Sequence, residues 1–388
     1  MLVVRRALRA IQPFVAALGA VPVVVSLAVM GGCEVFDPSL VELPACTGRR
    51  PPAAPSVADG SDGERYVLVL RDIVIDQRAE DGAPPESAPW RTTGFNLDSM
   101  CTTANDLTTE CVPAREGASV QVDGDDGIDN TFGNSFFPIL NLVQSGIEGD
   151  LVASQAAGVG ALVIMISDWN GERDDPRVTV AIAQSVFGSP GVGGEAPELL
   201  VVGSNATLSD GTTPAPPPAW DGEDYFWVRD DNFLGGDLDM PAVQINHAYV
   251  RDGQLVVFVP NGTEFKLIGT GFGATVRMTG MIAMGELYDT LIMGVTDPPP
   301  RITVAGRWGL NHILATSENV GICPGSAAFR TLMQTLTGMC DVQLQPATPA
   351  DTSLPCDALS IATTFDAYVG HVGGIAVGQP LPNPCSDP

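Results

Sequence analysis

Positive charge is scarce in this sequence of 388 residues. Lysine and arginine together number 19 against 46 aspartates and glutamates, so the formal net charge is −27, and Lys266 is the single lysine. Such a surface repels the phosphate backbone of nucleic acids, so we expect no nucleic-acid partner. The same negative charge favours solubility and suits divalent cations.

Catalytic motifs are missing as well. The three histidines, His247, His312 and His371, are interpreted as packed residues rather than catalytic bases. The sequence contains no Gly-x-Ser-x-Gly, no His-Glu-x-x-His and no phosphate-cradling glycine loop. It has no Cys-x-x-Cys spacing either, which argues against zinc and redox sites. The sequence therefore predicts no catalytic residue.

What the sequence does have is an export signal at its front. Arg5, Arg6 and Arg9 precede an apolar run over residues 14–32, which ends in two glycines before Cys33. A basic start, an apolar run and small residues before a cleavage point are typical of a secretory signal. An uncleaved transmembrane helix is an alternative, because about 20 apolar residues suffice to span a bilayer, and plain secretion is another. With cleavage or with an uncleaved helix, the bulk of the chain lies outside the cytoplasm, since the positive charge precedes the run.

The segment Leu27-Ala-Val-Met-Gly-Gly-Cys33 resembles the lipobox of bacterial lipoproteins. The resemblance implies that residues 1–32 are a signal peptide and that Cys33 is lipidated and becomes the mature N-terminus. Lipoproteins of this kind carry more than one acyl chain, and two anchoring signals hold a protein stably on a membrane. Glu34 stands where such families carry an Asp for retention in the inner membrane. The resemblance therefore implies an outer-membrane anchor, with the protein facing the periplasm or the cell surface.

Eight cysteines occur, and export permits disulfides. With Cys33 set aside for lipid, seven remain, so at least one thiol is unpaired. Cys101 and Cys111 are close neighbours, and a bridge between them would close a short loop. Cys46 is the expected unpaired thiol, with pairing to Cys385 as the alternative. The last four cysteines can pair among themselves in three ways; they are Cys323, Cys340, Cys356 and Cys385.

Composition divides the rest of the chain into three parts. Residues 33–64 are rich in proline, alanine and charge and are predicted to form a lipidated, disordered tether. Residues 65–320 are predicted to form a mainly β domain, an antiparallel β-sandwich of which a concanavalin-like arrangement is one form. Residues 321–388 are predicted to be a small helical region stapled by disulfides, because segments 326–336 and 357–369 carry apolar residues at helical period.

Several segments are predicted as strands or helices within the β domain. Strands are predicted over residues 66–75, 161–167, 178–187, 199–202, 274–284 and 287–295, and a helix over residues 135–157. A three-stranded meander is predicted over residues 244–268, because Asp252-Gly253 and Asn261-Gly262 favour tight hairpin turns. In its third strand Phe265 and Leu267 alternate with charged residues, so one face is predicted to be buried.

The most distinctive local motif is an acidic loop over residues 123–130. Its candidate calcium ligands are Asp123, Asp125, Asp126, Asp129 and Asn130. Calcium takes about 6–8 oxygen ligands, and Gly124 and Gly127 allow the loop to bend sharply. The spacing differs from that of an EF-hand and resembles the Asp/Gly/Asn-rich calcium loops of extracellular modules. The alternative is a plain acidic turn, because Asp, Asn and Gly form turns by themselves.

A second acidic loop follows the predicted strand at residues 161–167. Its candidate ligand-binding residues are Asp168, Trp169, Asn170, Glu172, Asp174 and Asp175. An exposed tryptophan beside carboxylates and an amide would suit a sugar, a peptide or the edge of a second metal site. The alternative is a solvated connection between strands. A pair of carboxylates here could serve a glycosidase, although any acidic loop offers such pairs.

The leader and the segment Asp126-Gly-Ile-Asp-Asn130 resemble a functionally uncharacterised class of bacterial outer-membrane lipoproteins, which carry an Asp-Gly-x-Asp-Asn loop ahead of a β domain. We therefore predict a membrane-tethered binding or structural module of the envelope, stabilised by calcium, which engages a glycan or an envelope protein. The alternative is a hydrolase that uses carboxylates of both acidic loops on envelope or extracellular polysaccharide. The second hypothesis requires the two loops to converge on one cleft.

Overall fold

The computed structural model describes residues 48–80, 82–143, 145–269, 272–294, 297–347, 351–381 and 383–385. All of them belong to one compact unit, Cys46–Pro388. Cys33 and the leader lie outside the described residues, and so does Cys46. None of the described helices combines the length and the apolar character that crossing a bilayer requires.

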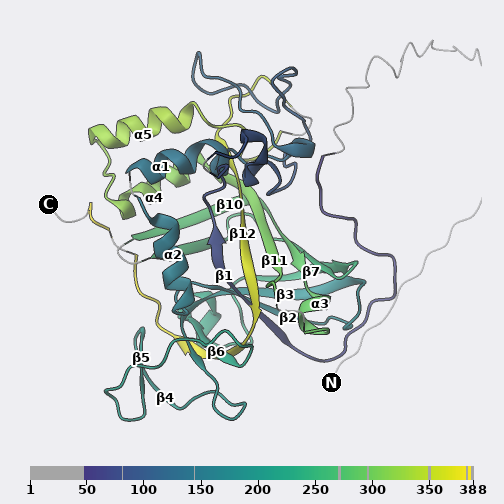
Figure 1. Cartoon of the computed structure of the whole chain (residues 1–388), viewed down its shortest axis with the longest axis vertical. Helices are drawn as coiled ribbons and strands as arrows, with labels where there is room; N and C mark the ends of the chain where they lie inside the picture. The colour runs from purple at the N-terminus through teal and green to yellow at the C-terminus, as the bar shows by residue number, and fades with distance from the viewer. Residues whose placement is uncertain are drawn as a thin grey trace, which may run out of the picture. The chain divides into compact units, whose positions relative to one another are not determined.

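In the described part of the chain, eight strands close into an antiparallel barrel (Figure 1). The barrel strands are β1 (Tyr66–Val74), β2 (Leu162–Ser167), β3 (Asp175–Pro190), β7 (Gln244–Arg251), β8 (Gln254–Phe258), β10 (Phe272–Glu286), β11 (Arg301–Gly309) and β12 (Ala358–Val369). Each pairs with the next barrel strand along the chain, and β12 returns to pair with β1. The mainly β, antiparallel prediction is thus confirmed, but the sandwich is wrong: pairing of β3 with β7 closes a single sheet on itself.

The remaining strands extend or flank this ring. They are β4 (Leu199–Val202), β5 (Asn205–Leu208), β6 (Asp224–Arg229), β9 (Glu264–Gly269) and β13 (His371–Ala376). The second half of β3 leaves the ring and pairs with β6, which pairs with β13, while β4 and β5 form a separate hairpin. Only part of the predicted meander forms, because β7 pairs with β8 but β9 pairs with β10 instead of β8.

Most helices gather over one end of the barrel, whereas α3 (Tyr288–Leu291) lies at the other end, where Tyr288 packs on Trp169 (Figure 1). The helices are α1 (Phe137–Val143), α2 (Ile147–Ala156), α3 (Tyr288–Leu291), α4 (Leu310–Thr316) and α5 (Ala327–Thr337). Single turns lie at η2 (Pro85–Ser87), η3 (Pro89–Arg91), η4 (Asp125–Gly127), η5 (Phe132–Phe136), η6 (Asp230–Asn232), η7 (Leu234–Gly236) and η8 (Ser317–Val320). The predicted helix at 135–157 is split into α1 and α2, and the predicted strand at 287–295 contains α3 instead. The predicted helix at 326–336 is confirmed as α5, whose first turn is capped by the Ser326 hydroxyl.

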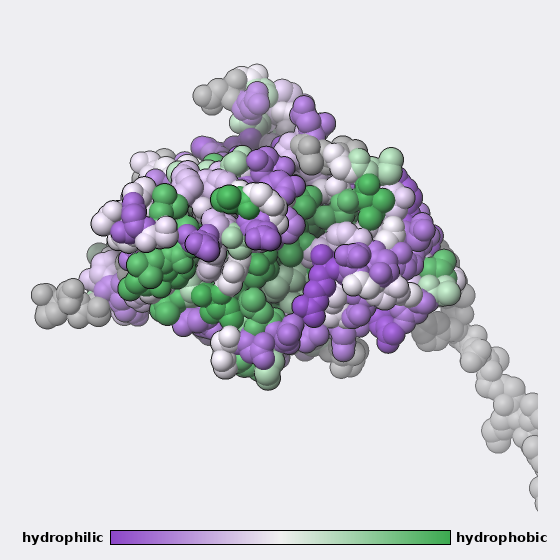
Figure 2. Space-filling model, turned by 90° about the horizontal axis from the view of Figure 1, so that it is seen from below, coloured by the Kyte–Doolittle hydropathy of each residue, from purple (hydrophilic) through white to green (hydrophobic). Residues whose placement is uncertain are grey.

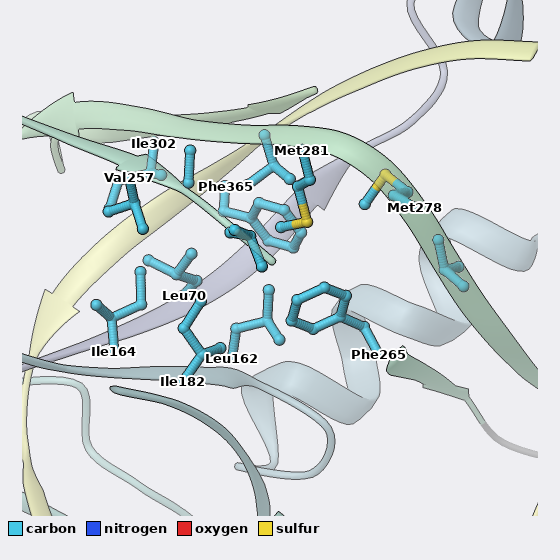
Figure 3. Packing of buried hydrophobic residues seen from close by; sticks show 14 of the residues in the cluster. Leu70, Leu162, Ile164, Ile182, Val257, Phe265, Met278, Met281, Ile302 and Phe365 are labelled. Carbon is cyan, nitrogen blue, oxygen red and sulfur yellow. The ribbon is translucent and has the colours of Figure 1, made fainter. Parts of the chain in front are cut away.

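The hydrophobic core fills the inside of the barrel (Figure 3). Alternate residues of a strand point to opposite faces, and β2 uses both. Leu162 and Ile164 point into the ring, whereas Val163 packs outside it with Phe226 and Val228 of β6. Because both faces are covered, β2 is apolar along nearly its whole length.

The C-terminal region is not a helical subdomain. Segment 357–369, predicted as its second helix, forms β12, which lies between β1 and β11 in the ring. β12 is largely buried on both faces, and its apolar residues fit both patterns: Leu359, Ala362 and Phe365 have helical spacing, whereas Leu359, Ile361 and Phe365 alternate as in a strand. Long-range pairing decides between them.

Disulfides are present, but not in the pairs that sequence proximity suggested. Cys111 pairs with Cys356, so the bridge between Cys101 and Cys111 is wrong, and Cys101 is itself disulfide-bonded. Cys323 pairs with Cys385, one of the pairings left open for the last four cysteines. The free thiol among the described residues is Cys340, which is buried.

The prediction of a disordered tether is wrong for residues 48–64, and residues 33–47 lie outside the described residues. Residues 48–64 lie against the barrel, where the Tyr249 hydroxyl donates to the carbonyl of Pro52. Arg177 forms an ion pair with Asp59, and the backbone N–H of Asp62 donates to the Trp169 carbonyl at 2.8 Å. This segment is called the N-terminal arm below.

Candidate functional site

The residues predicted to bind calcium point in different directions. Asp125 and Asp126 lie exposed in η4, whereas Asp129 and Asn130 are buried, with 3% and 2% of their surface exposed. The exposure of Asp123 is intermediate, and its side chain is partly buried. In the part of the chain that the structure describes, no group of three or more His, Cys, Asp or Glu side chains is arranged to hold a metal ion. Calcium binding at this loop stays a prediction.

The buried members of the loop attach it to the barrel. The Asn130 amide donates to Gln77 Oε1 at 2.8 Å, and its Oδ1 accepts the N–H of Ala362 at 3.1 Å. Asp129 Oδ2 accepts the backbone N–H of Leu97 at 2.6 Å. These side chains are already engaged in hydrogen bonds that hold the loop against β12, against Gln77 after β1 and against the segment that contains Leu97. Their role in the described structure is architectural.

Behind the loop, four carboxyl groups line one small cavity: Asp98, Asp123, Asp129 and Asp341. Burial, followed by repulsion from the neighbouring carboxylates, raises the pKa of Asp123 to about 7 and that of Asp129 well above its usual value. Burial also raises the pKa of Asp341 to about 6 and that of Asp98 above its usual range. We call these four residues the carboxyl cluster.

Cysteine side chains line the same cavity as the carboxyl cluster, and this cavity has no room for a ligand. Cys340 and the Cys111–Cys356 disulfide line the same cavity, whose volume is about 10 Å³. Such a space holds one water at most. Burial raises the pKa of the Cys340 thiol to about 12, so this thiol is not poised to react.

A buried ion pair, which the sequence analysis missed, borders the carboxyl cluster. Arg307 Nη1 lies 2.9 and 2.7 Å from the two carboxylate oxygens of Glu110, and the side chains are 5% and 6% exposed. Arg307 Nη2 also donates to the carbonyl of Leu97 at 2.6 Å. An arginine inside the apolar run of β11 was the available signal, because a charge is rarely buried without a partner.

The second acidic loop does not present an aromatic platform. Trp169 is fully buried, with 0% of its surface exposed, so the expected exposed ring is wrong. Its Nε1 donates to the carbonyl of Glu172 at 3.0 Å, and its ring packs edge-on against Tyr66 and Tyr288. The indole closes the end of the barrel opposite the cap formed by α1, α2, α4 and α5.

Most polar groups of this loop are engaged within it. Asp175 is buried and accepts the N–H of Asn170 at 2.8 Å, while Asn170 Nδ2 donates to the Asp174 carbonyl at 3.1 Å. The Asp174 carboxylate accepts the N–H of Asp252 at 2.8 Å. Asp168 and Glu172 stay exposed.

The two acidic loops lie at opposite ends of β1. Trp169 packs on Tyr66, which begins β1, whereas Asn130 bonds to Gln77, which follows the end of the strand. A strand of nine residues is about 30 Å long. The two acidic loops therefore do not converge on one cleft. The hydrolase hypothesis required such a convergence.

Asp168 instead borders a groove on the outside of the barrel, called the outer groove here. It consists of two hollows of about 450 and about 320 Å³ that share Thr179. The polar hollow is lined by Asp59, Gly60, Ser61, Asp168, Arg177, Thr179 and Asn246. The floor of the second hollow is apolar, with Val67, Met165, Ala181 and Val372, and its rim includes Arg65, Asp239 and Gln244.

The outer groove results from strand alternation and from the N-terminal arm. Val178 and Val180 of β3 point into the barrel, so Thr179 between them faces outward. The register of β3 with β7 shifts twice nearby, and such bulges redirect side chains. The arm supplies one wall, held by the ion pair between Arg177 and Asp59. This site could not be predicted from the sequence, because residues 48–64 were expected to form part of a disordered tether.

A second hollow space, called the inner chamber here, lies inside the barrel and beneath the helical cap. It consists of two adjoining cavities of about 50 and about 60 Å³. Ile75, Phe132, Leu267 and Trp308 line both. Trp308 is 4% exposed, and its buried indole N–H has no hydrogen-bond partner.

The structure thus offers an outer groove, an inner chamber and a closed carboxyl cluster. Comparison of the chain with protein-family models, with curated proteins and with solved structures finds no match.

Proposed function

We propose that this chain is a lipid-anchored protein of the bacterial outer membrane that binds a protein partner in its outer groove. The lipobox-like segment ending at Cys33 supports the anchor. The disulfides Cys111–Cys356 and Cys323–Cys385 support a location outside the cytoplasm, because such bonds persist in oxidising compartments.

The outer groove is the observation that carries the proposal. Its two adjoining hollows combine hydrogen-bonding groups with an apolar floor, the mixture that fixes and buries a ligand. One wall includes Val372 of β13, which pairs with β6 alone among the described strands. An edge strand can accept an extended peptide as an additional strand. We therefore take the ligand to be an extended segment of an envelope protein.

Apolar side chains outside the groove support a protein partner. Figure 2 shows them gathered in patches among hydrophilic residues, on the side of the molecule seen from below in Figure 1. The hairpin of β4 and β5 exposes 51% of Leu200 and 66% of Val202. Exposed apolar patches of this kind mark interaction surfaces.

Thr179→Arg tests the proposal, because it places a long side chain where the two hollows join. A phage-displayed library of random dodecapeptides is selected on the folded wild-type protein. We expect enriched peptides to bind the wild type and to lose at least about tenfold in affinity for Thr179→Arg, which is about 1.4 kcal/mol.

The matched control is Thr331→Arg on α5, an exposed threonine that lines neither hollow and lies outside the β4–β5 hairpin, and it keeps wild-type binding. Failure to enrich any peptide, or peptides that bind Thr179→Arg as well as the wild type, would overturn the proposal. If a polysaccharide panel binds instead and Thr179→Arg abolishes that binding, the groove is retained and the protein partner is replaced by a glycan.

The hydrolase alternative gains no support from the geometry. Its two acidic loops are separated by the length of β1, and the carboxyl cluster behind the first loop is closed to substrate.

A further inference from the structure

We propose that the segment bound in the outer groove carries a basic residue, a lysine or an arginine, that binds the Asp168 carboxylate, and an apolar residue two or four positions away that fills the second hollow. This sequence preference rests on the proposed function, because it specifies which peptides the groove selects. The charges that line the groove and the order of its two hollows both support it.

Asp168 carries the unbalanced charge of the groove. The other two charged side chains of the polar hollow, Asp59 and Arg177, form an ion pair with each other. In the second hollow Arg65 Nη1 lies 3.1 Å from Asp239 Oδ1. The Asp168 carboxylate has no hydrogen-bond or ion-pair partner among the described residues. Three carboxylates thus face two guanidinium groups in the described lining, which leaves one net negative charge.

Neutral polar side chains beside Asp168 offer further acceptors. The Thr179 hydroxyl and the Asn246 amide line the same hollow, and neither forms a side-chain hydrogen bond with another described residue. An ammonium group has three donors and a guanidinium group has five, so either cation can use several acceptors in addition to a carboxylate. Hydrogen bonds between charged groups are roughly twice as strong as those between neutral groups. The polar hollow therefore favours a cation over a neutral side chain.

The two hollows follow one another along β2. Asp168 comes directly after this strand, whereas Met165 within it lines the apolar floor of the second hollow. Three residues of a strand span about 10 Å. In an extended segment alternate residues point to the same side, so residues two or four positions apart are separated by about 7 or about 13 Å. An apolar residue at either spacing can cover Met165 while the basic residue contacts Asp168.

The charge of the whole chain favours the same partner. The formal net charge of −27 attracts basic segments and repels acidic ones. Such long-range attraction raises the rate of association and is weakened by salt. Local and overall charge therefore act in the same direction.

Asp168→Asn tests the preference, because it removes the charge and keeps a side chain of the same shape. The φ angle of Asp168 is 59°, and asparagine adopts this region as readily as aspartate. The probes are the dodecapeptides that the phage selection enriches and that Thr179→Arg fails to bind. We expect lysine or arginine to be over-represented in them, two or four positions from an apolar residue. Asp168→Asn should bind them about five- to tenfold more weakly, between the effect of an exposed ion pair and that of a buried charged hydrogen bond.

A change in the peptide separates the ion pair from an indirect effect on the fold. Glutamine in place of the basic residue should weaken binding to the wild type by a similar factor and should weaken binding to Asp168→Asn no further. Asp252→Asn is the matched control, since Asp252 is exposed, has a φ angle of 53° and lines neither hollow. It should keep wild-type affinity.

Two results overturn the preference: enriched peptides that depend on Thr179 but lack the basic residue, and peptides that bind Asp168→Asn as tightly as the wild type. In both cases the groove remains a site for a protein partner. If the selection enriches no peptide, the proposed function and the sequence preference fall together.

Discussion

At the scale of single residues, the carboxyl cluster links folding to pH. Asp123 and Asp341 have pKa values raised to about 7 and about 6, with burial as the main cause. The folded protein therefore holds protons that the unfolded chain releases near pH 4. The stability that these groups contribute is fully present below the unfolded pKa and is lost as pH rises through the folded pKa. Asp231, whose pKa is lowered to about 2 mainly by its hydrogen bond with Arg229, acts in the opposite sense only below about pH 4.

We therefore expect the free energy of unfolding to fall as pH rises from 5 to 8, by roughly 1–4 kcal/mol, since each pKa unit corresponds to about 1.4 kcal/mol. Asp123→Asn should remove part of this slope, because the amide stays neutral and can still accept the N–H of Thr102. At pH 8 the variant should be more stable than the wild type by roughly 1–3 kcal/mol, measured by urea denaturation at each pH.

Asp125→Asn is the control for that experiment, since Asp125 belongs to the same loop but is exposed. It should retain the wild-type pH profile. A wild-type stability that rises between pH 5 and pH 8 would contradict the assignment.

At the scale of elements, β9 is attached to the barrel from two sides. On one side it pairs with β10 along its whole length. On the other side the Gln184 side chain of β3 accepts the N–H of Lys266 and donates to its carbonyl, both at 2.7 Å. One side chain thus takes the place of a neighbouring strand. β9 also packs against α2, so this link helps to close the capped end of the barrel.

Gln184→Met should release β9, because methionine fills a similar volume but leaves both backbone groups of Lys266 unpaired. We expect a loss of about 2–3 kcal/mol in unfolding free energy and faster hydrogen exchange at the Lys266 amide. Gln254→Met on β8 is the control, since that side chain bonds only to the Glu286 side chain, and it should cost less than about 0.5 kcal/mol. Unchanged exchange at Lys266 would refute the bridging role.

The elements also show what the sequence could predict. The hairpin of β7 and β8 was predictable because Asp252-Gly253 adopts the positive φ angles of its turn, 53° and 87°. The partner of β9 was not, because β10 is long enough to pair with β9 through residues 272–277 and with β8 through residues 282–286. For β12, period and composition agreed with a helix, and only pairing with β1, nearly 300 residues earlier in the chain, fixed it as a strand.

The same limit applies to the sites. The composition of the loop at 168–175 indicated exposure, but Trp169 is buried by Tyr66 and Tyr288, which are distant in sequence. The outer groove and the inner chamber are each assembled from several strands, so no local motif indicates them. An unpaired indole becomes visible only when every neighbour of Trp308 is in place.

At the scale of the whole molecule, the proposal combines a lipid anchor with a disulfide-bonded barrel. The proposed anchor requires Cys33, which lies outside the described residues, whereas the arm lies against the barrel from residue 48 onward. The proposed anchor and the barrel can be tested separately because Cys33 lies outside the described residues that form the barrel.

Cys33→Ala should abolish incorporation of radiolabelled palmitate and release the folded protein from the membrane fraction, because no lipid can then be attached. Cys340→Ala, which removes a free thiol inside the barrel unit, is the control and should stay labelled and membrane-bound. Protein that lacks label but remains in the membrane after Cys33→Ala would favour the uncleaved helix instead.

The closure of β12 onto β1 also determines when the protein can take shape. β1 is the first barrel strand to leave the ribosome, and its partner β12 is complete only when residue 369 has been made. The barrel therefore stays open between β1 and β12 during most of synthesis. Contacts so distant along the chain form slowly. Under the proposed export, a polypeptide in that condition would remain threadable through a narrow translocation pore, and its assembly would be deferred to the compartment where its bridges can be oxidised.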